Sequence, residues 1–223
     1  MDLYEIMKNL YNIDEFKGYS DDDIVFLKEM FGNLPKVLED YYRKVGRTEI
    51  LKHLQDEWIL PEHYKKWDWL KNEKDFYILM NENQGVFQLG IRREDMCKDD
   101  PPVYYTDHSY EEWIKYCDTL SKFLLCQSAY QSVFTFEYYP EEFYSITAEE
   151  LKIIREKLKK YPFELKNDEQ DYPFNMSFYF NASDDLYVVM NYNEEDMQVL
   201  YGAVSQKSYN ELEKIVGGLG EPM

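Results

Sequence analysis

Three strand-like segments follow one another in FNMSFYFNASDDLYVVMNYNEEDMQVLY, residues 174–201. In the first of them, residues 174–181, Phe and Met alternate with mostly polar side chains, and this period of two is typical of a half-buried strand. Two apolar runs follow, each after a short acidic turn, so the stretch predicts a three-stranded antiparallel meander. The turns are residues 183–185 and 193–196, and the runs are residues 186–190 and 197–201.

A repeated signature predicts helices before and after this meander. A hydroxyl side chain that can cap the first turn is followed three positions later by an acid that can bond back, and an apolar stripe comes next. Gly32 is expected to end the first of these helices and Gly217 the last. A fifth helix is expected from Asn33 to Gly46, with Pro35 in its first turn, where a missing N–H costs nothing. The four capped starts are Ser20 with Asp23, Ser109 with Glu112, Thr147 with Glu150, and Ser208 with Glu211.

A hairpin and the meander supply the sheet on which these helices are expected to pack. Residues 76–91 predict the hairpin, because two apolar runs flank a five-residue polar connection. The helices that begin at Thr147 and Ser208 are expected to cover the meander. The fold class is therefore α+β, with helices packed on a largely antiparallel sheet.

The chain is expected to contain two parts of this class. Residues 1–134 would form a core, with a long amphipathic helix from Ser109 to Leu124 close to its end. Residues 135–223 would form a helix–three-strand–helix extension packed on that core, or the two parts would form one continuous domain. No linker rich in Gly, Ser or Pro separates them, and residues 131–145 are the softest boundary.

The charge of the chain argues against several functions. Its 223 residues carry 44 acidic and 25 basic side chains, a formal net charge of −19. Nucleic-acid binding requires cationic contacts to phosphate, and an anionic membrane surface attracts basic segments, so neither partner is expected. A basic protein would instead be attracted quickly and in a salt-sensitive way. Residues 101–150 hold nine acids and two bases and so contribute −7 alone.

Other features of the chain indicate a cytoplasmic protein. No run approaches the roughly 18 apolar residues of a membrane span. Residues 1–10 lack the apolar stretch of a signal peptide. Cys97, Cys117 and Cys126 form no CxxC pair and are expected to be reduced.

Tyrosine is unusually frequent, with 22 residues beside 13 Phe and only 9 Gly. Most of these rings are expected in the core, since aromatic side chains dominate buried area. A core cannot easily satisfy so many hydroxyl groups, so several tyrosines are expected at the surface. Surface tyrosines among carboxylates are common at protein interfaces.

The chain carries no signature of a catalytic centre. Its three histidines show no close metal-binding spacing, and no glycine-rich loop joins a strand to a helix as a phosphate site requires. Paired acids such as Asp99-Asp100 and Glu141-Glu142 are numerous, but 44 acids produce such pairs by chance. We expect no catalytic residue, no metal, no cofactor and no enzymatic activity.

Three stretches of the first 130 residues follow one another in a distinctive order. They are Ile24-x-x-Leu27-x-x-x-Phe31-Gly32-x-Leu34-Pro35 with Leu38-x-Asp40-Tyr41-Tyr42-x-x-Val45-Gly46, then residues 69–91, then Asp100-Pro101-Pro102-Val103-Tyr104 with Trp113, Leu120-Ser121 and Phe123-Leu124. This order is similar to that of the SUKH superfamily, best known as bacterial immunity proteins against polymorphic toxins. Each residue in them also has a plain structural role, so the order and spacing carry the resemblance. Val45-Gly46-Arg47 departs from the family, whose members often have Asn-Gly-Gly there, and residues after about 135 are unmatched.

This resemblance implies a protein without catalytic activity that binds and neutralises a cognate toxin domain. A nuclease toxin is cationic where it grips phosphate, so an acidic inhibitor complements it. The first alternative is a regulatory or scaffold protein of the same fold that holds an endogenous protein. The second is a hydrolase that uses carboxylates near Asp99-Asp100 or Glu141-Glu142.

One short segment is the candidate for the partner-binding surface. Residues 137–144 pack four aromatic rings, a proline and three acids into the most acidic stretch of the chain. Alternate rings of the same segment would equally serve to anchor the C-terminal part. The partner-binding residues that we predict are Glu137, Tyr138, Tyr139, Glu141, Glu142 and Tyr144.

Overall fold

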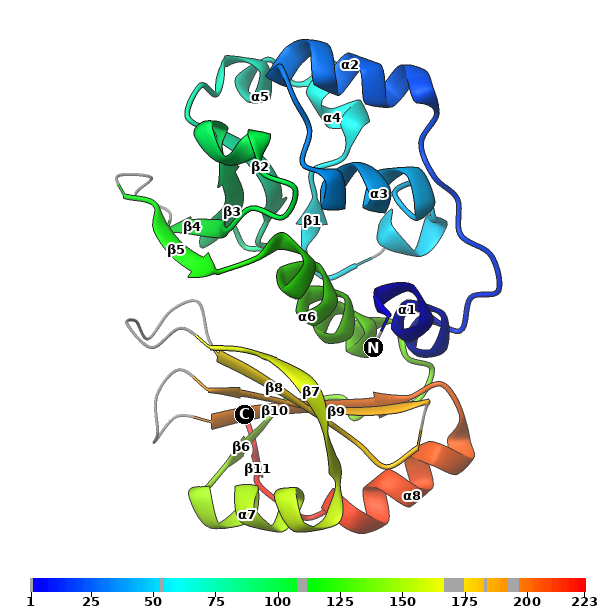
Figure 1. Ribbon diagram of the computed structural model, residues 1–223. Helices are drawn as coiled ribbons and strands as arrows, with labels where there is room; N and C mark the ends of the chain where they lie inside the picture. Colours follow the sequence, from blue (N-terminus) through cyan, green and yellow to red (C-terminus); the bar gives the residue numbers. More distant parts are fainter. Residues whose placement is uncertain (1, 53, 108–111, 167–174, 183, 192–196) are drawn as a thin grey trace. The chain divides into compact units, whose positions relative to one another are not determined.

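The structure is a computed structural model of residues 1–223. It describes all of them except residues 1, 53, 108–111, 167–174, 183 and 192–196. The described chain forms two compact units, each with its own antiparallel sheet and helices (Figure 1). Residues 15–123 form the central unit, and residues 1–14 with 124–223 form the terminal unit. The division falls inside a helix, and so differs from the boundary expected between residues 134 and 135.

The central unit has a five-stranded antiparallel sheet in the order β1-β2-β3-β4-β5. The expected hairpin is confirmed, since β2 and β3 pair from Phe76 opposite Arg92 to Asn81 opposite Gln88. Its strands are β1 Glu57–Trp58, β2 Phe76–Asn81, β3 Phe87–Arg92, β4 Val103–Asp107 and β5 Ile114–Cys117. Its helices are α2 Asp21–Phe31, α3 Lys36–Lys44, α4 Pro61–Lys66, α5 Asp68–Asn72 and the start of α6 Leu120–Ser132, with 3-10 turns η1 Glu49–Lys52 and η2 Arg93–Cys97.

Two helices of the central unit begin and end close to where the sequence predicts. Ser20 and Asp23 form a reciprocal capping box at the start of α2, and Gly32 caps its end with a φ of 77°. Pro35 is the N-cap of α3, which ends at Lys44, just before Gly46. A side chain at Gly46 would meet the ring of Tyr19 at 2.7 Å, so this glycine permits a close approach.

The prediction of a long helix from Ser109 to Leu124 is wrong. Ser109 itself lies outside the described residues, and Ile114–Cys117 form strand β5, which pairs with β4. The helix of this region, α6, begins only at Leu120. Aromatic residues favour strands as well as helix faces, and here long-range packing decides: the ring of Trp113 stacks on Phe76 with centroids 3.9 Å apart.

The terminal unit has a six-stranded antiparallel sheet in the order β11-β6-β10-β9-β8-β7. The predicted meander is confirmed as β8, β9 and β10, which pair as neighbours. The strands are β6 Tyr144–Ile146, β7 Lys159–Leu165, β8 Asn175–Phe180, β9 Asp185–Asn191, β10 Met197–Ala203 and β11 Glu221–Pro222. The helices are α1 Leu3–Tyr11, α6 from residue 124 onward, α7 Ala148–Lys157 and α8 Gln206–Val216, with the 3-10 turn η3 Val133–Thr135.

Helices α7 and α8 cover one face of this sheet, as expected (Figure 1). Ile154 of α7 and Leu212 of α8 are fully buried against Val199 and its neighbours on the strands. Figure 1 places α1 and α6 on the other face, where the rings of Phe163 and Phe178 pack with centroids 5.2 Å apart. Both faces of the sheet are therefore covered, which is the α+β arrangement that the sequence predicts.

The start of α8 differs from the prediction in its cap. The N-cap is Ser205, whose hydroxyl accepts the N–H of Ser208 at 3.2 Å. Ser208 lies inside the helix, and its hydroxyl donates to Asp184, which also accepts the hydroxyl of Ser205. Gly217 directly follows the last residue of α8, so the predicted end of this helix is confirmed. Its N–H donates to the backbone carbonyl of Glu213 at 2.6 Å.

The start of α7 allows a test of the predicted capping box. Thr147 accepts the N–H of Glu150 at 3.3 Å, and Glu150 accepts the N–H of Thr147 at 2.8 Å. Thr147→Ala is expected to lower the free energy of unfolding by about 1 kcal/mol, because an orphan N–H of the first turn loses its acceptor. Urea denaturation followed by circular dichroism measures this loss. Thr147→Ser keeps the acceptor, and an equal loss in that variant would contradict the assignment.

Most tyrosines lie in the core, and several of their hydroxyl groups form hydrogen bonds there. Tyr11 donates to the carbonyl of Ser128 at 2.7 Å, and Tyr64 to that of Ile78 at 2.9 Å. The hydroxyls of Tyr42 and Tyr77 lie 2.9 Å apart and share a hydrogen bond. Backbone carbonyls therefore accept the hydroxyl groups of some of the buried tyrosines.

Candidate functional site

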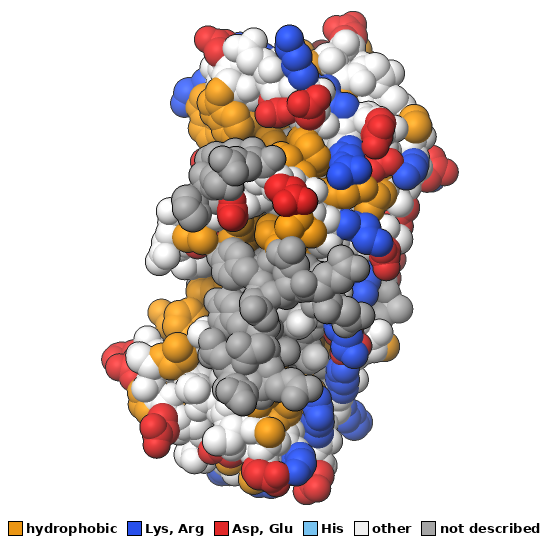
Figure 2. All heavy atoms as spheres, turned by 90° about the vertical axis from the view of Figure 1, so that its left-hand side faces the viewer, with side chains coloured by type: hydrophobic (Ala, Val, Ile, Leu, Met, Phe, Trp, Pro, Cys, Tyr) orange, Lys and Arg blue, Asp and Glu red, His pale blue; other side chains and the backbone are white. Residues whose placement is uncertain are grey.

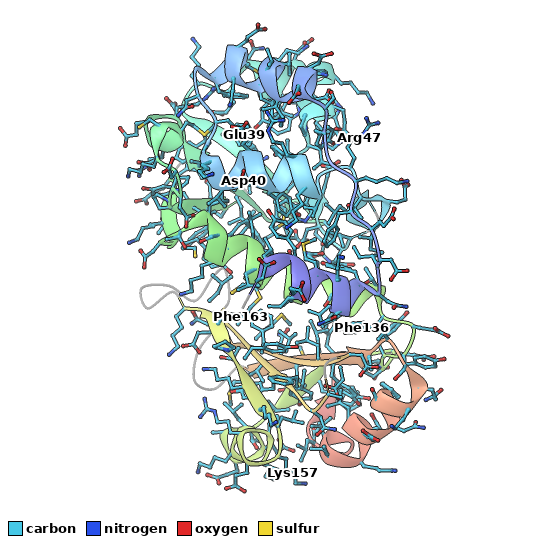
Figure 3. The ribbon with its side chains drawn as sticks, turned by 45° about the vertical axis from the view of Figure 1, so that its right-hand side comes forward. Glu39, Asp40, Arg47, Phe136, Lys157 and Phe163 are labelled. Carbon is cyan, nitrogen blue, oxygen red and sulfur yellow. The ribbon has the colours of Figure 1, made fainter. Side chains whose placement is uncertain are left out.

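The predicted docking segment, residues 137–144, lies between η3 and β6 in the terminal unit. Near the start of the segment, Tyr138 forms two backbone hydrogen bonds with Ala203 at the end of β10, at 3.3 and 2.9 Å. Phe136 lies against Gly202 of the same strand, where a side chain would meet its ring at 2.6 Å (Figure 3). The segment therefore starts from a fixed point on the sheet.

Two of the predicted binding residues have structural roles. Tyr144 is half-buried in β6, and its ring lies against the stacked rings of the core, 6.1 Å from the centroid of Tyr201. Tyr201 in turn stacks on Tyr187 with centroids 5.5 Å apart and donates a hydrogen bond to Glu213 at 2.8 Å. Tyr138 is also half-buried. Tyr144 in particular anchors the segment, the role that we considered for alternate rings.

The other rings of the segment are exposed to solvent. Tyr139 is 55% exposed and Phe143 is 39% exposed. Met223, 62% exposed, joins them because its N–H donates to the carbonyl of Phe143 at 3.0 Å. Among the residues that the structure describes, the only other exposed large hydrophobic side chains are Val25 and Trp69. Exposed apolar side chains thus concentrate at this segment, as they do at binding surfaces.

The carboxylates of the segment flank these rings in sequence, and no described basic residue neutralises them. Glu137, Glu141 and Glu142 are exposed, and none of them forms an ion pair with a described residue. Glu137 accepts a hydrogen bond from the hydroxyl of Tyr138, which raises the pKa of that tyrosine. A cationic partner would therefore meet acids whose charge is not already cancelled.

Basic side chains gather elsewhere on the terminal unit. Figure 2 shows Lys and Arg along one side of its surface, and residues 155–166 hold five exposed bases. The net charge of −19 is therefore unevenly distributed over the chain. The docking segment itself contains three acids and no base. The five bases are Arg155, Lys157, Lys159, Lys160 and Lys166.

Neither candidate for hydrolytic chemistry has the surroundings of a catalytic pair. Asp100 accepts the N–H and the hydroxyl of Ser121 at 2.8 and 2.6 Å, so it stabilises the first turn of α6. Glu141 and Glu142 lie in solvent. Burial raises the pKa of the Cys117 thiol, which makes it less nucleophilic. No group of His, Cys, Asp and Glu in the described part of the chain is placed to hold a metal ion.

A second concentration of carboxylates, in the central unit, was missed by the sequence reasoning. Asp56, Glu57, Glu62 and Glu82 line one cleft, although up to 26 positions separate them. Only Asp56 and Glu57 are adjacent in the sequence, and the pairing of β1 with β2 together with helix α4 brings the others to them. The sequence alone carries no signal for this cluster, because it does not show that β1 pairs with β2.

Comparisons with known proteins do not assign the chain to a family. No family model matches it, and searches of curated proteins and of solved structures found no significant match. Among the helices that the structure describes, none has both the length and the apolar character that crossing a bilayer requires. The site is therefore interpreted from its own geometry.

Proposed function

We propose that this chain is an immunity protein of the SUKH type, which binds a cognate bacterial toxin domain and neutralises it. The resemblance behind this proposal lies in residues 24–124, nearly all of them in the central unit. The toxin is a basic protein, and the chain acts by covering its functional surface, without catalysis of its own.

The docking segment is the observation that carries this proposal. Interfaces draw their affinity from exposed aromatic anchors, and here Tyr139 and Phe143 are exposed together. Uncompensated acids such as Glu141 and Glu142 add electrostatic attraction. A nuclease is a natural target, because its phosphate-binding surface carries the opposite charge.

Co-expression tests the function directly. The effector domain encoded by the gene next to this one should stop growth of a host cell, and co-expression of this chain should restore it. The two purified proteins should then form a stable complex. Growth arrest that this chain does not relieve would contradict the proposal. A complex with an endogenous housekeeping protein alone would favour a scaffold.

Salt should slow the association of the complex. Raising NaCl from about 50 mM to about 500 mM is expected to lower the association rate constant about tenfold, because ions screen attraction between exposed charges. The dissociation rate constant should change less. Surface plasmon resonance at several salt concentrations measures both constants. An association rate that does not depend on salt would contradict a role of electrostatic attraction in binding the partner.

A further inference from the structure

The central unit contains a cleft whose lining is strongly acidic. Its volume is about 560 Å³, within the range of ligand-binding sites. Four of its described lining residues are carboxylates, and none is Lys or Arg. Leucines add apolar wall area to the same cleft. The carboxylates are Asp56, Glu57, Glu62 and Glu82, and the leucines are Leu51, Leu54 and Leu60.

The fold brings these carboxylates together through one strand pair and one helix. β1 pairs with β2 so that Glu57 lies opposite Asn81, next to Glu82. Asp56 precedes β1 and accepts the N–H of Asn83 at 3.3 Å. Helix α4 follows β1 directly and contributes Glu62 from its first turn. The carboxylates thus occupy positions set by secondary structure.

Uncharged donors hold three of the acids in place. Glu57 accepts the side-chain amide of Asn81 at 3.1 Å, and Glu62 accepts the hydroxyl of Tyr19. Glu82 accepts two backbone N–H groups of its own turn, at 2.8 and 3.0 Å. None of the three forms an ion pair with a described basic residue. Their orientation is fixed while their negative charge is left uncancelled.

The cleft wall also includes an unsatisfied donor. Trp58 is only 5% exposed, and its indole N–H has no hydrogen-bond partner among the described residues. Buried polar groups almost always have a partner, so an unpaired donor beside a cavity points to a missing one. Because Trp58 lines the cleft, its indole N–H resonance reports on binding there.

We propose that this cleft receives an arginine side chain of a protein partner. The guanidinium group forms paired hydrogen bonds with carboxylates, and it is more weakly hydrated than an ammonium group. The aliphatic stem of arginine would pack along the leucines while its head reaches the acids. Only the identity of the partner rests on the proposed function, because the cleft itself can be tested with a peptide.

A peptide titration of the whole ¹⁵N-labelled protein tests the cleft. Acetyl-Gly-Arg-Gly-amide should shift the indole N–H resonance of Trp58 in a saturable way. The matched peptide with citrulline, which has the same shape without the charge, should not. Equal shifts with both peptides would overturn the proposal. Tighter binding of spermidine than of the arginine peptide would overturn the assignment to a protein side chain.

A pair of double variants separates the cleft from the total charge. Glu57→Gln/Glu82→Gln keeps the hydrogen-bond acceptors and should weaken peptide binding at least fivefold. Glu29→Gln/Glu156→Gln removes the same charge from exposed positions on α2 and α7 and should leave the binding unchanged. Equal weakening by both would contradict the cleft. If the arginine peptide binds but no toxin is neutralised, only the proposed function fails.

Discussion

Replacing Asp185 with asparagine is expected to stabilise the protein more at pH 7.5 than at pH 4, with a difference of up to about 3 kcal/mol. Asp185 is fully buried at the start of β9. One of its oxygens accepts the N–H groups of Asn181 and Ala182, at 2.7 and 2.8 Å. The other oxygen is buried without a hydrogen-bond partner among the described residues. Asparagine keeps the first oxygen and removes the charge.

The direction of this effect follows from the pKa. The pKa of Asp185 is raised from 3.8 to about 6, chiefly by burial, and the nearby Asp184 and Glu211 contribute to this rise. The folded state therefore binds the proton more tightly than the unfolded state does. The resulting stability is complete below pH 3.8 and is lost as the pH rises through about 6. A shift of about 2 pKa units corresponds to about 3 kcal/mol.

Urea denaturation at several pH values measures this difference. All four tryptophans lie between residues 58 and 113, in the central unit, so circular dichroism is the suitable signal for the terminal unit. Glu141→Gln removes one exposed charge and serves as the matched control, with no pH-dependent difference expected. A difference between Asp185→Asn and the wild type that stays constant from pH 4 to pH 7.5 would contradict the raised pKa.

The parts of the fold that the sequence predicts are those that neighbouring residues determine. Both reciprocal capping boxes predicted at Ser20 and Thr147 are present, because the partner lies three residues away on the same turn. The alternation of residues 174–181 identifies β8 for a similar reason: a strand places every second side chain on one face. Such local signals do not depend on the rest of the chain.

The wrong predictions share a dependence on distant residues. Trp113 and Tyr116 have the spacing of a helix face, but Trp113 stacks on Phe76 and the segment becomes strand β5. Ser208 has the signature of a cap, but its hydroxyl is bound to Asp184 of the β8–β9 turn. In both cases a tertiary contact replaces the local preference, and the sequence pattern does not show which contact forms.

The candidate site was predictable only where it is continuous in sequence. The composition of residues 137–144 is visible directly, but their exposure is not: Tyr139 is exposed while Tyr144 packs near Tyr201. The acidic cleft is discontinuous, because Glu57 and Glu82 meet only through the β1–β2 pair. The register in which β1 pairs with β2 cannot be read from a single sequence.

Reversing both charges of the docking segment should have the largest effect on partner binding. Glu141→Lys/Glu142→Lys is expected to weaken the affinity for the toxin domain about 100-fold, which is about 2.7 kcal/mol. Two attractive contacts with a basic partner become repulsive, so most of the loss should lie in the association rate. The thermal unfolding temperature should hardly change, because both side chains are exposed and form no ion pair with a described residue.

A control with the same net charge separates local from general electrostatics. Glu29→Lys/Glu156→Lys reverses two exposed acids on α2 and α7, away from the segment in sequence. It should weaken binding far less, and an equal loss would show that total charge alone governs association. Unchanged affinity in Glu141→Lys/Glu142→Lys would exclude the segment from the interface.

The aromatic part of the segment should act on a different rate. Tyr139→Ala removes a ring that is 55% exposed and that we expect to be buried by the partner. Anchors of this kind hold a formed complex together, so the dissociation rate should rise about tenfold with little change in association. Charge and ring variants that alter the same rate constant would contradict this division of roles. If the charge variant alters only the association rate and the ring variant only the dissociation rate, the acids of the segment attract the partner and its exposed ring holds the formed complex.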